Sequence, residues 1–220
     1  AFARNRFLSP PSGFLLNRSG LAALEEAVAD LLRAGAELLA GGKSLPGPGF
    51  LFENTLLRAT GRAFLAAPRS LQREAFGTTT LLVLAEKAEQ LLEIAGELEG
   101  TLALSVFSGG RGCNDDPLYA RLASLLALKT GRLLNDKMPT GLAVVPSMVH
   151  GGPFPSTGHP GFTSVGIPAS LLRFTALRCY DNVRPDRLPA ALADRNPTGR
   201  MWRLIDGAWT QGDAPGNHQR

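Results

Sequence analysis

The stretch of sequence that decides the fold is residues 78–134, which reads TTTLLVLAEKAEQLLEIAGELEGTLALSVFSGGRGCNDDPLYARLASLLALKTGRLL. Threonines and branched apolar residues fill the short runs 78–84 and 101–107, which is typical of buried strands, and a third such run closes the stretch. Between these runs, 87–98 and 117–129 repeat apolar residues at helical spacing. This alternation of strands and helices indicates parallel βαβ units. We therefore predict an α/β fold with a mainly parallel sheet flanked by helices.

Upstream of this stretch, one segment has strong helical periodicity. Its apolar residues fall near a 3.6-residue period and predict a helix over 21–39, with Ser19 as the N-cap and Gly41-Gly42 as the stop. Residues 50–57 predict a short strand, and 63–67 a helical turn.

Downstream lies a long segment, Met148 to Gly166, with the sequence MVHGGPFPSTGHPGFTSVG. It contains two of the three histidines and is too rich in glycine and proline for a helix or a central strand, so it is predicted to be a loop. Its apolar residues can hold it against a core. We expect an ordered loop that lines a cleft, with a purely structural crossover as the alternative.

The rest of the chain is less regular. Residues 164–177 predict a helix, and 201–209 a hairpin with an Asp-Gly turn. We expect three parts: an irregular N-terminal segment 1–20, an α/β domain 21–180 and a C-terminal extension 181–220.

Composition limits the function. The 220 residues are 44% hydrophobic, and 23 basic and 19 acidic residues give a formal charge of +4. The basic residues form no continuous run and aromatic residues make up only 7%, so no nucleic-acid partner is indicated. Neither a signal peptide nor an 18-residue apolar span is recognisable, so no membrane partner and a cytoplasmic location are expected. Cys113 and Cys179 are too few and too far apart for a disulfide framework or a zinc site, and no metal is expected.

Several segments resemble, in matching order, the C-terminal catalytic-domain portion of aldehyde dehydrogenases. The resemblance is to the branch that oxidises 2,5-dioxovalerate (α-ketoglutaric semialdehyde), and it extends from about residue 21 to 209. It implies a small aldehyde substrate, and NAD or NADP as the cofactor of the family. The matching segments are REAFG (73–77), GTLALSVF (100–107), TGRLLNDKMPTG (130–141), the loop 148–166 and LLRFTALRCYDNV (171–183).

The resemblance assigns roles to individual residues. In the family, the glutamate of an E-x-F-G-P motif hydrogen-bonds the nicotinamide ribose, and Glu74 and Phe76 stand at the matching positions. Thr78 replaces the proline of that motif. The family's P-T-G and H-G-G-P-aromatic-P motifs line the mouth of the substrate tunnel, and residues 139–141 and 150–155 match them.

The sequence also departs from the family. Residues 136–138 replace an aromatic residue and an asparagine, a change that bears on substrate recognition. The family's nucleophilic cysteine, general-base glutamate and cofactor domain lie upstream of the matched region, and neither Cys113 nor Cys179 matches the nucleophile. Aldehyde oxidation in the family needs that thiolate and NAD(P). We therefore expect a truncated dehydrogenase-like domain that binds no cofactor of its own and does not oxidise aldehydes alone.

Two alternatives stay open. One is a stand-alone hydrolase (esterase) with a small ester substrate, because His-Gly-Gly is similar to an esterase oxyanion motif and the loop region is rich in hydroxyls, although no G-x-S-x-G elbow is present. The other is a non-catalytic oligomerisation or interaction module that forms a homo-oligomer through apolar surface such as the helix that begins at Leu21. The hydrolase would draw its catalytic set from Ser147, Ser156, Ser164, His150 and His159, with Asp136 or Asp181 to orient the histidine.

Overall fold

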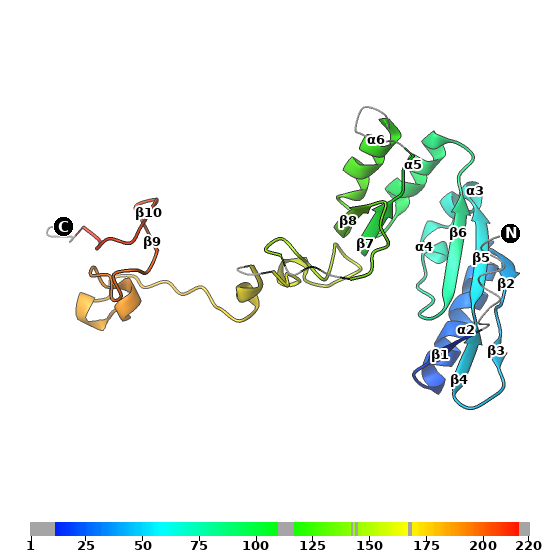
Figure 1. Ribbon diagram of the computed structural model, residues 1–220, viewed down its shortest axis with the longest axis horizontal. Coiled ribbons are helices and arrows are strands. Elements are labelled where there is room, and N and C mark those ends of the chain that lie inside the picture. Colours follow the sequence, from blue (N-terminus) through cyan, green and yellow to red (C-terminus); the bar gives the residue numbers. More distant parts are fainter. Residues whose placement is uncertain (1–11, 110–116, 142, 144, 167–168, 216–220) are drawn as a thin grey trace. The chain divides into compact units, whose positions relative to one another are not determined.

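The computed structural model describes residues 12–109, 117–141, 143, 145–166 and 169–215 (Figure 1). It divides into two compact units, Ala1–Arg173 and Phe174–Arg220. Each unit is described by itself.

In the first unit, helix α2 (Arg18–Arg33) has Asn17 as its N-cap: the Asn17 side chain accepts a 2.8 Å hydrogen bond from the Gly20 amide. The helix ends in a Schellman motif. Gly35 has a φ of 104°, and the amides of Gly35 and Ala36 donate to the carbonyls of Leu32 and Leu31 at 3.1 and 3.0 Å.

The predicted helix 21–39 was therefore wrong at both ends. Ser19 lies inside the first turn and is not the N-cap. Residues 37–40, which continue the apolar spacing of the helix, instead form strand β2 (Glu37–Ala40). Only glycine adopts the left-handed backbone at position 35 at little cost, and that turn ends the helix before its apolar periodicity does.

A mixed three-stranded sheet, in the order β2, β5 (Thr55–Thr60) and β6 (Thr79–Leu84), lies in this unit. Strand β5 pairs antiparallel with β2 and parallel with β6. Two short helices, α3 (Gly61–Ala66) and α4 (Pro68–Leu71), connect β5 to β6. The single strand predicted over 50–57 is in fact two strands, because the chain changes sheets at Asn54.

A second, antiparallel sheet uses the first half of that stretch. Its order is β1 (Ser12–Leu15), β4 (Phe50–Glu53) and β3 (Ser44–Leu45). It packs on α2, where the fully buried Phe52 meets Leu24 and Val28.

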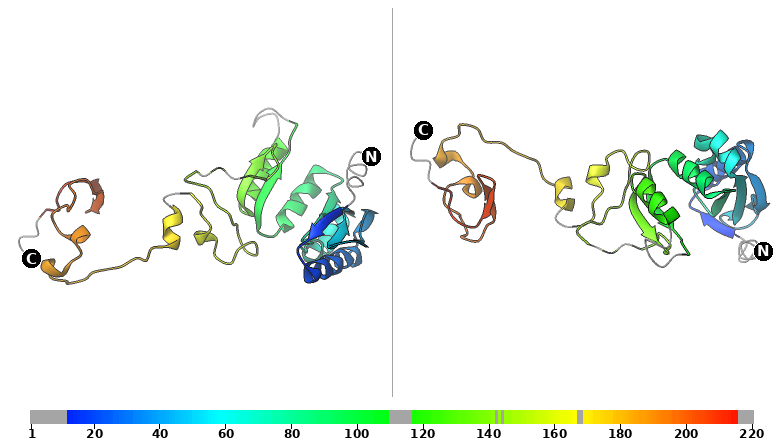
Figure 2. Two further views of the ribbon diagram at one scale, coloured as in Figure 1. Left: turned by 60° about the horizontal axis from the view of Figure 1, so that its bottom comes forward. Right: turned by 90° about the horizontal axis from the view of Figure 1, so that it is seen from above.

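A third element is a parallel strand pair. Helix α5 (Ala88–Glu97) leads from β6 to β7 (Thr101–Val106), and α6 (Pro117–Leu126) leads from β7 to β8 (Thr130–Asn135), which pairs with β7. The helices α5 and α6 contact each other (Figure 1 and Figure 2). The α/β class with helix-flanked parallel strands is thus confirmed, although the described parallel strands form two pairs and not one sheet.

The segment 148–166 is a loop, as predicted, but the helix expected over 164–177 was wrong. Ser164 forms an isolated β-bridge with Val149, and the amides of Val165 and Gly166 donate to the Met148 carbonyl at 2.9 and 3.2 Å. These tertiary contacts use the residues that would have begun the helix. In the described part of these two ranges, the helical elements are short 3-10 turns: η1 (Pro160–Phe162) lies before the bridge and η2 (Ala169–Arg173) after it.

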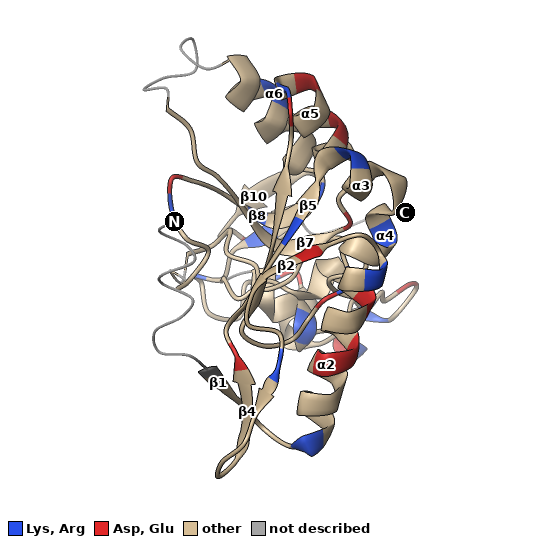
Figure 3. Cartoon of the chain, turned by 90° about the vertical axis from the view of Figure 1, so that its right-hand side faces the viewer, with Lys and Arg blue, Asp and Glu red and all other residues tan. Residues whose placement is uncertain are grey.

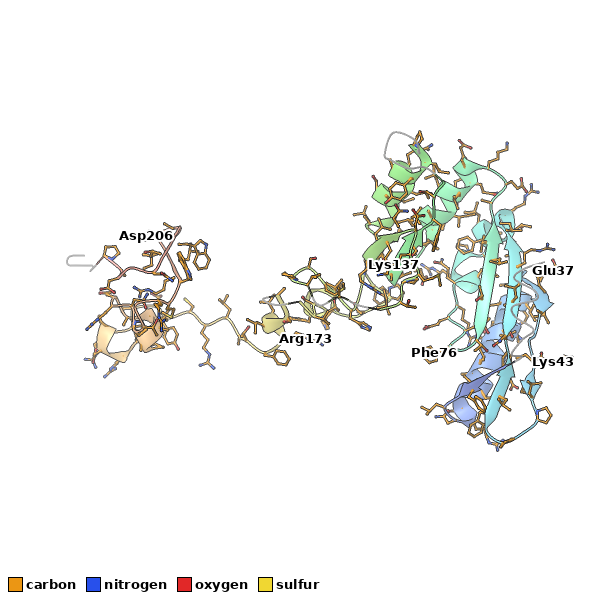
Figure 4. The ribbon with its side chains drawn as sticks, in the orientation of Figure 1. Glu37, Lys43, Phe76, Lys137, Arg173 and Asp206 are labelled. Carbon is orange, nitrogen blue, oxygen red and sulfur yellow. The ribbon has the colours of Figure 1, made fainter. Side chains whose placement is uncertain are left out.

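The second unit contains two 3-10 turns, η3 (Pro185–Arg187) and η4 (Ala190–Leu192), and the predicted hairpin, β9 (Arg203–Ile205) with β10 (Ala208–Thr210). Asp206, labelled in Figure 4, and Gly207 have φ angles of 51° and 81°, the backbone that a two-residue I′ turn requires. Hydrogen bonds hold this unit together: the Arg203 guanidinium donates to the carbonyls of Ala193, Asp194 and Gly212 at 2.6 to 2.9 Å.

Candidate functional site

A cavity of about 810 Å³ opens in the first unit beside the start of β7. Its walls come from the segment between α4 and β6, from the first residues of β7, from Arg132 on β8 and from the loop around His150. Parts of the motifs assigned by resemblance therefore meet here: the wall includes Glu74, Pro139, His150, Gly151, Pro155 and Ser156.

Gln72 fixes the wall that carries Glu74. Its amide nitrogen donates to the carbonyls of Pro68 and Glu97, both at 3.0 Å, and its side-chain oxygen accepts from the Glu99 amide at 2.8 Å. One side chain thus ties the end of α4 to the connection between α5 and β7. It holds the backbone two residues before Glu74 in a fixed position.

The neighbouring side chains point to different places. Arg73 is turned toward helix α2, where it forms ion pairs with Asp30 and Glu26. Glu74 is exposed and lines the cavity, and no hydrogen bond or ion pair joins its carboxylate to another described residue. Phe76, expected beside it, is 81% exposed and lies outside the cavity wall (Figure 4).

Arg132 fixes a second wall. From the middle of β8 its guanidinium donates to the carbonyls of Pro139 and Gly141 at 3.2 and 3.3 Å. It thereby holds the Pro-Thr-Gly turn against the sheet. Sequence reasoning missed both Arg132 and Gln72. A charged residue inside the apolar run TGRLL was the available signal for Arg132, and nothing comparable marks Gln72.

The loop around His150 is held by its backbone. The His150 amide donates to the Thr163 carbonyl at 2.8 Å. Gly151 and Gly152 are buried, and a Cβ on Gly152 would overlap the Thr101 carbonyl, just as a Cβ on Gly131 would overlap the Gly151 carbonyl. The loop therefore lies directly on the first residues of β7 and β8. As expected, residues of this loop line a cavity.

The residues of the hydrolase hypothesis are not brought together. The hydroxyl of Ser156 donates to the Pro153 carbonyl at 2.7 Å, and that of the buried Ser164 to the carbonyls of Met148 and Gly166, both at 3.3 Å. Ser147 lies exposed in a turn. Among the described residues, no hydrogen bond links any of these serines to a histidine.

The remaining members of that hypothesis have other neighbours or belong to the second unit. The His150 ring borders the cavity, whereas the His159 ring packs near Phe162 with 6.1 Å between ring centroids. The Asp136 carboxylate accepts a 2.8 Å hydrogen bond from the Ser108 amide, and Asp181 belongs to the second unit. Within the described part of the first unit, no hydrogen bond joins one of these serines, a histidine and Asp136 into a catalytic set.

In the described ranges, no cluster of three or more His, Cys, Asp or Glu side chains could hold a metal ion, and no helix has the length and apolar character that a membrane span requires. Cys179 is free and exposed, and Cys113 lies outside the described residues.

Sequence comparison identifies relatives. No protein-family model matches the chain. The α-ketoglutaric semialdehyde dehydrogenase 2 of Azospirillum brasilense is 39% identical over 152 residues, which cover 69% of this chain and 28% of that protein. The α-ketoglutaric semialdehyde dehydrogenase of Acinetobacter baylyi is 36% identical over 156 residues, which cover 71% of this chain and 29% of that protein. The chain thus spans less than a third of the length of the curated relatives it matches.

Solved structures agree on the fold. Lactaldehyde dehydrogenase from Escherichia coli matches 64% of this chain and 26% of its own, with a TM-score of 0.50 and 22% identity. An NAD⁺ complex of an aldehyde dehydrogenase from Bacillus cereus matches the same shares, with a TM-score of 0.50 and 20% identity. None of these comparisons supports the hydrolase or the interaction-module alternative.

Proposed function

We propose, on the premise that this chain belongs to the aldehyde dehydrogenase family, that it is the C-terminal portion of the catalytic domain of a dehydrogenase. That dehydrogenase oxidises α-ketoglutaric semialdehyde with NAD(P)⁺. The observation that carries the proposal is the 39% identity over 152 residues to a dehydrogenase named for that substrate. The geometry supports it, because the segments that carry the family motifs border one cavity.

The exposed carboxylate of Glu74 fits the cofactor role that the resemblance implies. It borders the cavity and is committed to no described residue, so it is available to accept hydrogen bonds from ribose hydroxyls. Bound NAD(P)⁺ would supply the hydride acceptor. Gln72 contributes by fixing the backbone that carries Glu74, so that little ordering remains to be done when the ribose binds.

The opposite wall fits a substrate role. The Pro139–Gly141 turn, held by Arg132, and the His150–Pro155 segment, held by backbone contacts, would shape the entrance for the aldehyde. Neither cysteine of the chain stands at the family's nucleophile position. We therefore propose that the thiolate that attacks the aldehyde comes from another part of the dehydrogenase.

The test compares the 220-residue chain with a chimera in which it replaces the matched region of the Azospirillum relative. Both are given α-ketoglutaric semialdehyde with NAD⁺ or NADP⁺, and absorbance at 340 nm is followed. We expect no reduction by the chain alone and reduction by the chimera. Turnover by the chain alone would contradict the proposal for the thiol, and a folded but inactive chimera would contradict the proposed function.

A matched pair of variants assigns the cofactor contact. In the chimera, Glu74→Gln should raise the KM for the nicotinamide cofactor by roughly ten-fold, the effect of weakening one charge-assisted hydrogen bond. Glu99 also borders the cavity and is exposed, so Glu99→Gln serves as the control and should leave that KM unchanged. Equal effects of the two substitutions would remove Glu74 from the cofactor site.

A further inference from the structure

The two parallel strand pairs lie under one layer of helices. Helix α5 contacts α3 on one side and α6 on the other (Figure 1 and Figure 2). Its Ile94 belongs to the core that covers β5 and β6, and its Ala95 belongs to the core that covers β7 and β8. The strand pairs β5–β6 and β7–β8 are therefore covered by the same helix, as parts of one sheet would be.

The chain connections also suggest one sheet. The crossover from β5 to β6 joins strands that pair in parallel, and so does the crossover through α6 from β7 to β8. The crossover through α5, from β6 to β7, is of the same kind, yet among the described residues no ladder joins these two strands. A sheet that continues under one helix layer is thus interrupted between β6 and β7.

The edge of β6 is built like the edge of an interior strand. Solvent-facing edge strands usually carry charges, proline or a bulge that discourages pairing. At the other edge of the sheet, β2 has both a register irregularity between Leu38 and Ala40 and the charged Glu37, labelled in Figure 4, which pairs with Arg58 of β5. Figure 3 shows acidic colour on β2 and basic colour on β5. Strand β6, TTLLVL, has no charge, proline or glycine, and it pairs with β5 without interruption.

The ladder geometry identifies the unpaired groups. The Thr55 amide donates to the Thr78 carbonyl at 2.8 Å, so alternation along the parallel ladder directs the amides of Thr80, Leu82 and Leu84 toward β5. The amides of the alternate residues Thr79, Leu81 and Val83 point to the free edge of β6. In β7, the Thr101 amide donates to the Lys129 carbonyl at 2.8 Å, and the same alternation applies. The outward amides belong to Thr79, Leu81 and Val83 on β6 and to Leu102 and Leu104 on β7.

We infer that a β-strand from outside the described residues lies between β6 and β7 and hydrogen-bonds both free edges. This assignment rests on the proposed function. The chain covers 28% and 29% of its two relatives, and we assign the strand to the dehydrogenase polypeptide that corresponds to the remaining 72% and 71% of their length. Its chemistry is that of an extended, mainly apolar segment, because its neighbours on β6 include Leu82 and Leu84, which are 38% and 52% exposed. A second copy paired through β6 would leave the edge of β7 open, whereas one inserted strand satisfies both.

Hydrogen exchange of the 220-residue chain, followed by NMR for single amides, tests the free edges. We expect Thr79, Leu81 and Val83 to exchange roughly ten-fold or more faster than Thr80, Leu82 and Leu84, because only the second set is bonded to β5. Equal protection of the two sets in a monomer would mean that the chain closes its own edge and would overturn the inference. If light scattering shows a dimer and the two sets are equally protected, a second copy of the chain covers the edge. That result would also overturn the inference.

The same measurement on the chimera tests the occupant. Protection of Thr79, Leu81 and Val83 together with Leu102 and Leu104 is the expected result, and continued fast exchange at these five amides beside a protected ladder would contradict it. The outcome is separable from the proposed function. Protected edges in an inactive chimera would support the inserted strand and contradict the proposed function. Fast exchange in an active chimera would contradict the inserted strand and support the proposed function.

Discussion

In the first unit most of the buried side chains are apolar, whereas in the described part of the second unit the only buried side chain is that of Asn196. The first unit packs Phe52, Leu57 and Leu24 out of contact with water, at 0 to 1% exposure. The second unit instead joins its turns with hydrogen bonds from Asn196 and Arg203 to main-chain carbonyls. The difference teaches that a short segment without an apolar core can be held in one conformation by a few polar side chains that satisfy its backbone.

The largest effect should come from the apolar core. Phe52→Ala removes a ring with 0% exposure, and we expect the free energy of unfolding of the first unit to fall by about 3–5 kcal/mol. Urea unfolding followed by far-UV circular dichroism measures this loss. Both tryptophans, Trp202 and Trp209, lie in the second unit, so the tryptophan fluorescence transition should not move. Phe14→Ala is the control, because Phe14 is 76% exposed, and a loss as large as that for Phe52 would contradict the packing argument.

A smaller effect should appear in the second unit. The Asn196 amide donates to the carbonyls of Met201 and Gln211 at 2.8 and 2.7 Å, and its oxygen accepts from the Gly199 amide at 3.1 Å. Asn196→Ala removes the donor to the Met201 and Gln211 carbonyls, whereas the Gly199 amide keeps the Asn196 main-chain carbonyl as an acceptor at 3.3 Å. Tryptophan fluorescence should therefore report a loss of about 1–3 kcal/mol. Asn196→Asp keeps the acceptor and removes the donors, and its effect should lie between. An unchanged transition in both variants would show that burial, not hydrogen bonding, orders this unit.

The smallest effect tests a polar contact in the apolar unit. Glu37 and Arg58 are joined at 2.5 Å, but their side chains are 59% and 43% exposed. Such an ion pair contributes little, so Glu37→Gln should change the free energy of unfolding by no more than about 0.5 kcal/mol, and less in high salt. Circular dichroism in urea measures it. If the free energy of unfolding falls by well over about 1 kcal/mol, polar contacts stabilise the first unit as well, and the contrast between its apolar core and the polar second unit does not hold.

Much of the fold could be predicted because its information is local. The strands β6 and β7 and the helix α5 are short apolar or periodic runs, and each was predicted to within a few residues. The end of α2 was not predicted correctly, because Leu38 and Leu39 continue the helical spacing although Gly35 has already turned the chain. The helix expected from residue 164 also failed, because its first residues bond to Met148, far from them in sequence.

The candidate site divides in the same way. Glu74 and the loop around His150 could be found from motifs, which are contiguous in sequence. Gln72 and Arg132 could not, because their partners are main-chain carbonyls and amides in other elements, and any residue type supplies those groups. Sequence patterns record side chains, so an interaction with a distant backbone leaves almost no trace in them.

The contact of Gly131, Gly151 and Gly152 across the loop and the two strands has a consequence for engineering. Peptide groups set the spacing at this contact, because a Cβ on any of these glycines would overlap a neighbouring backbone or side-chain atom. Exposed residues of the same loop, such as Phe154 and His159, take no part in this contact and can therefore be exchanged without disturbing it. The three glycines, by contrast, are positions that a library of variants should leave untouched.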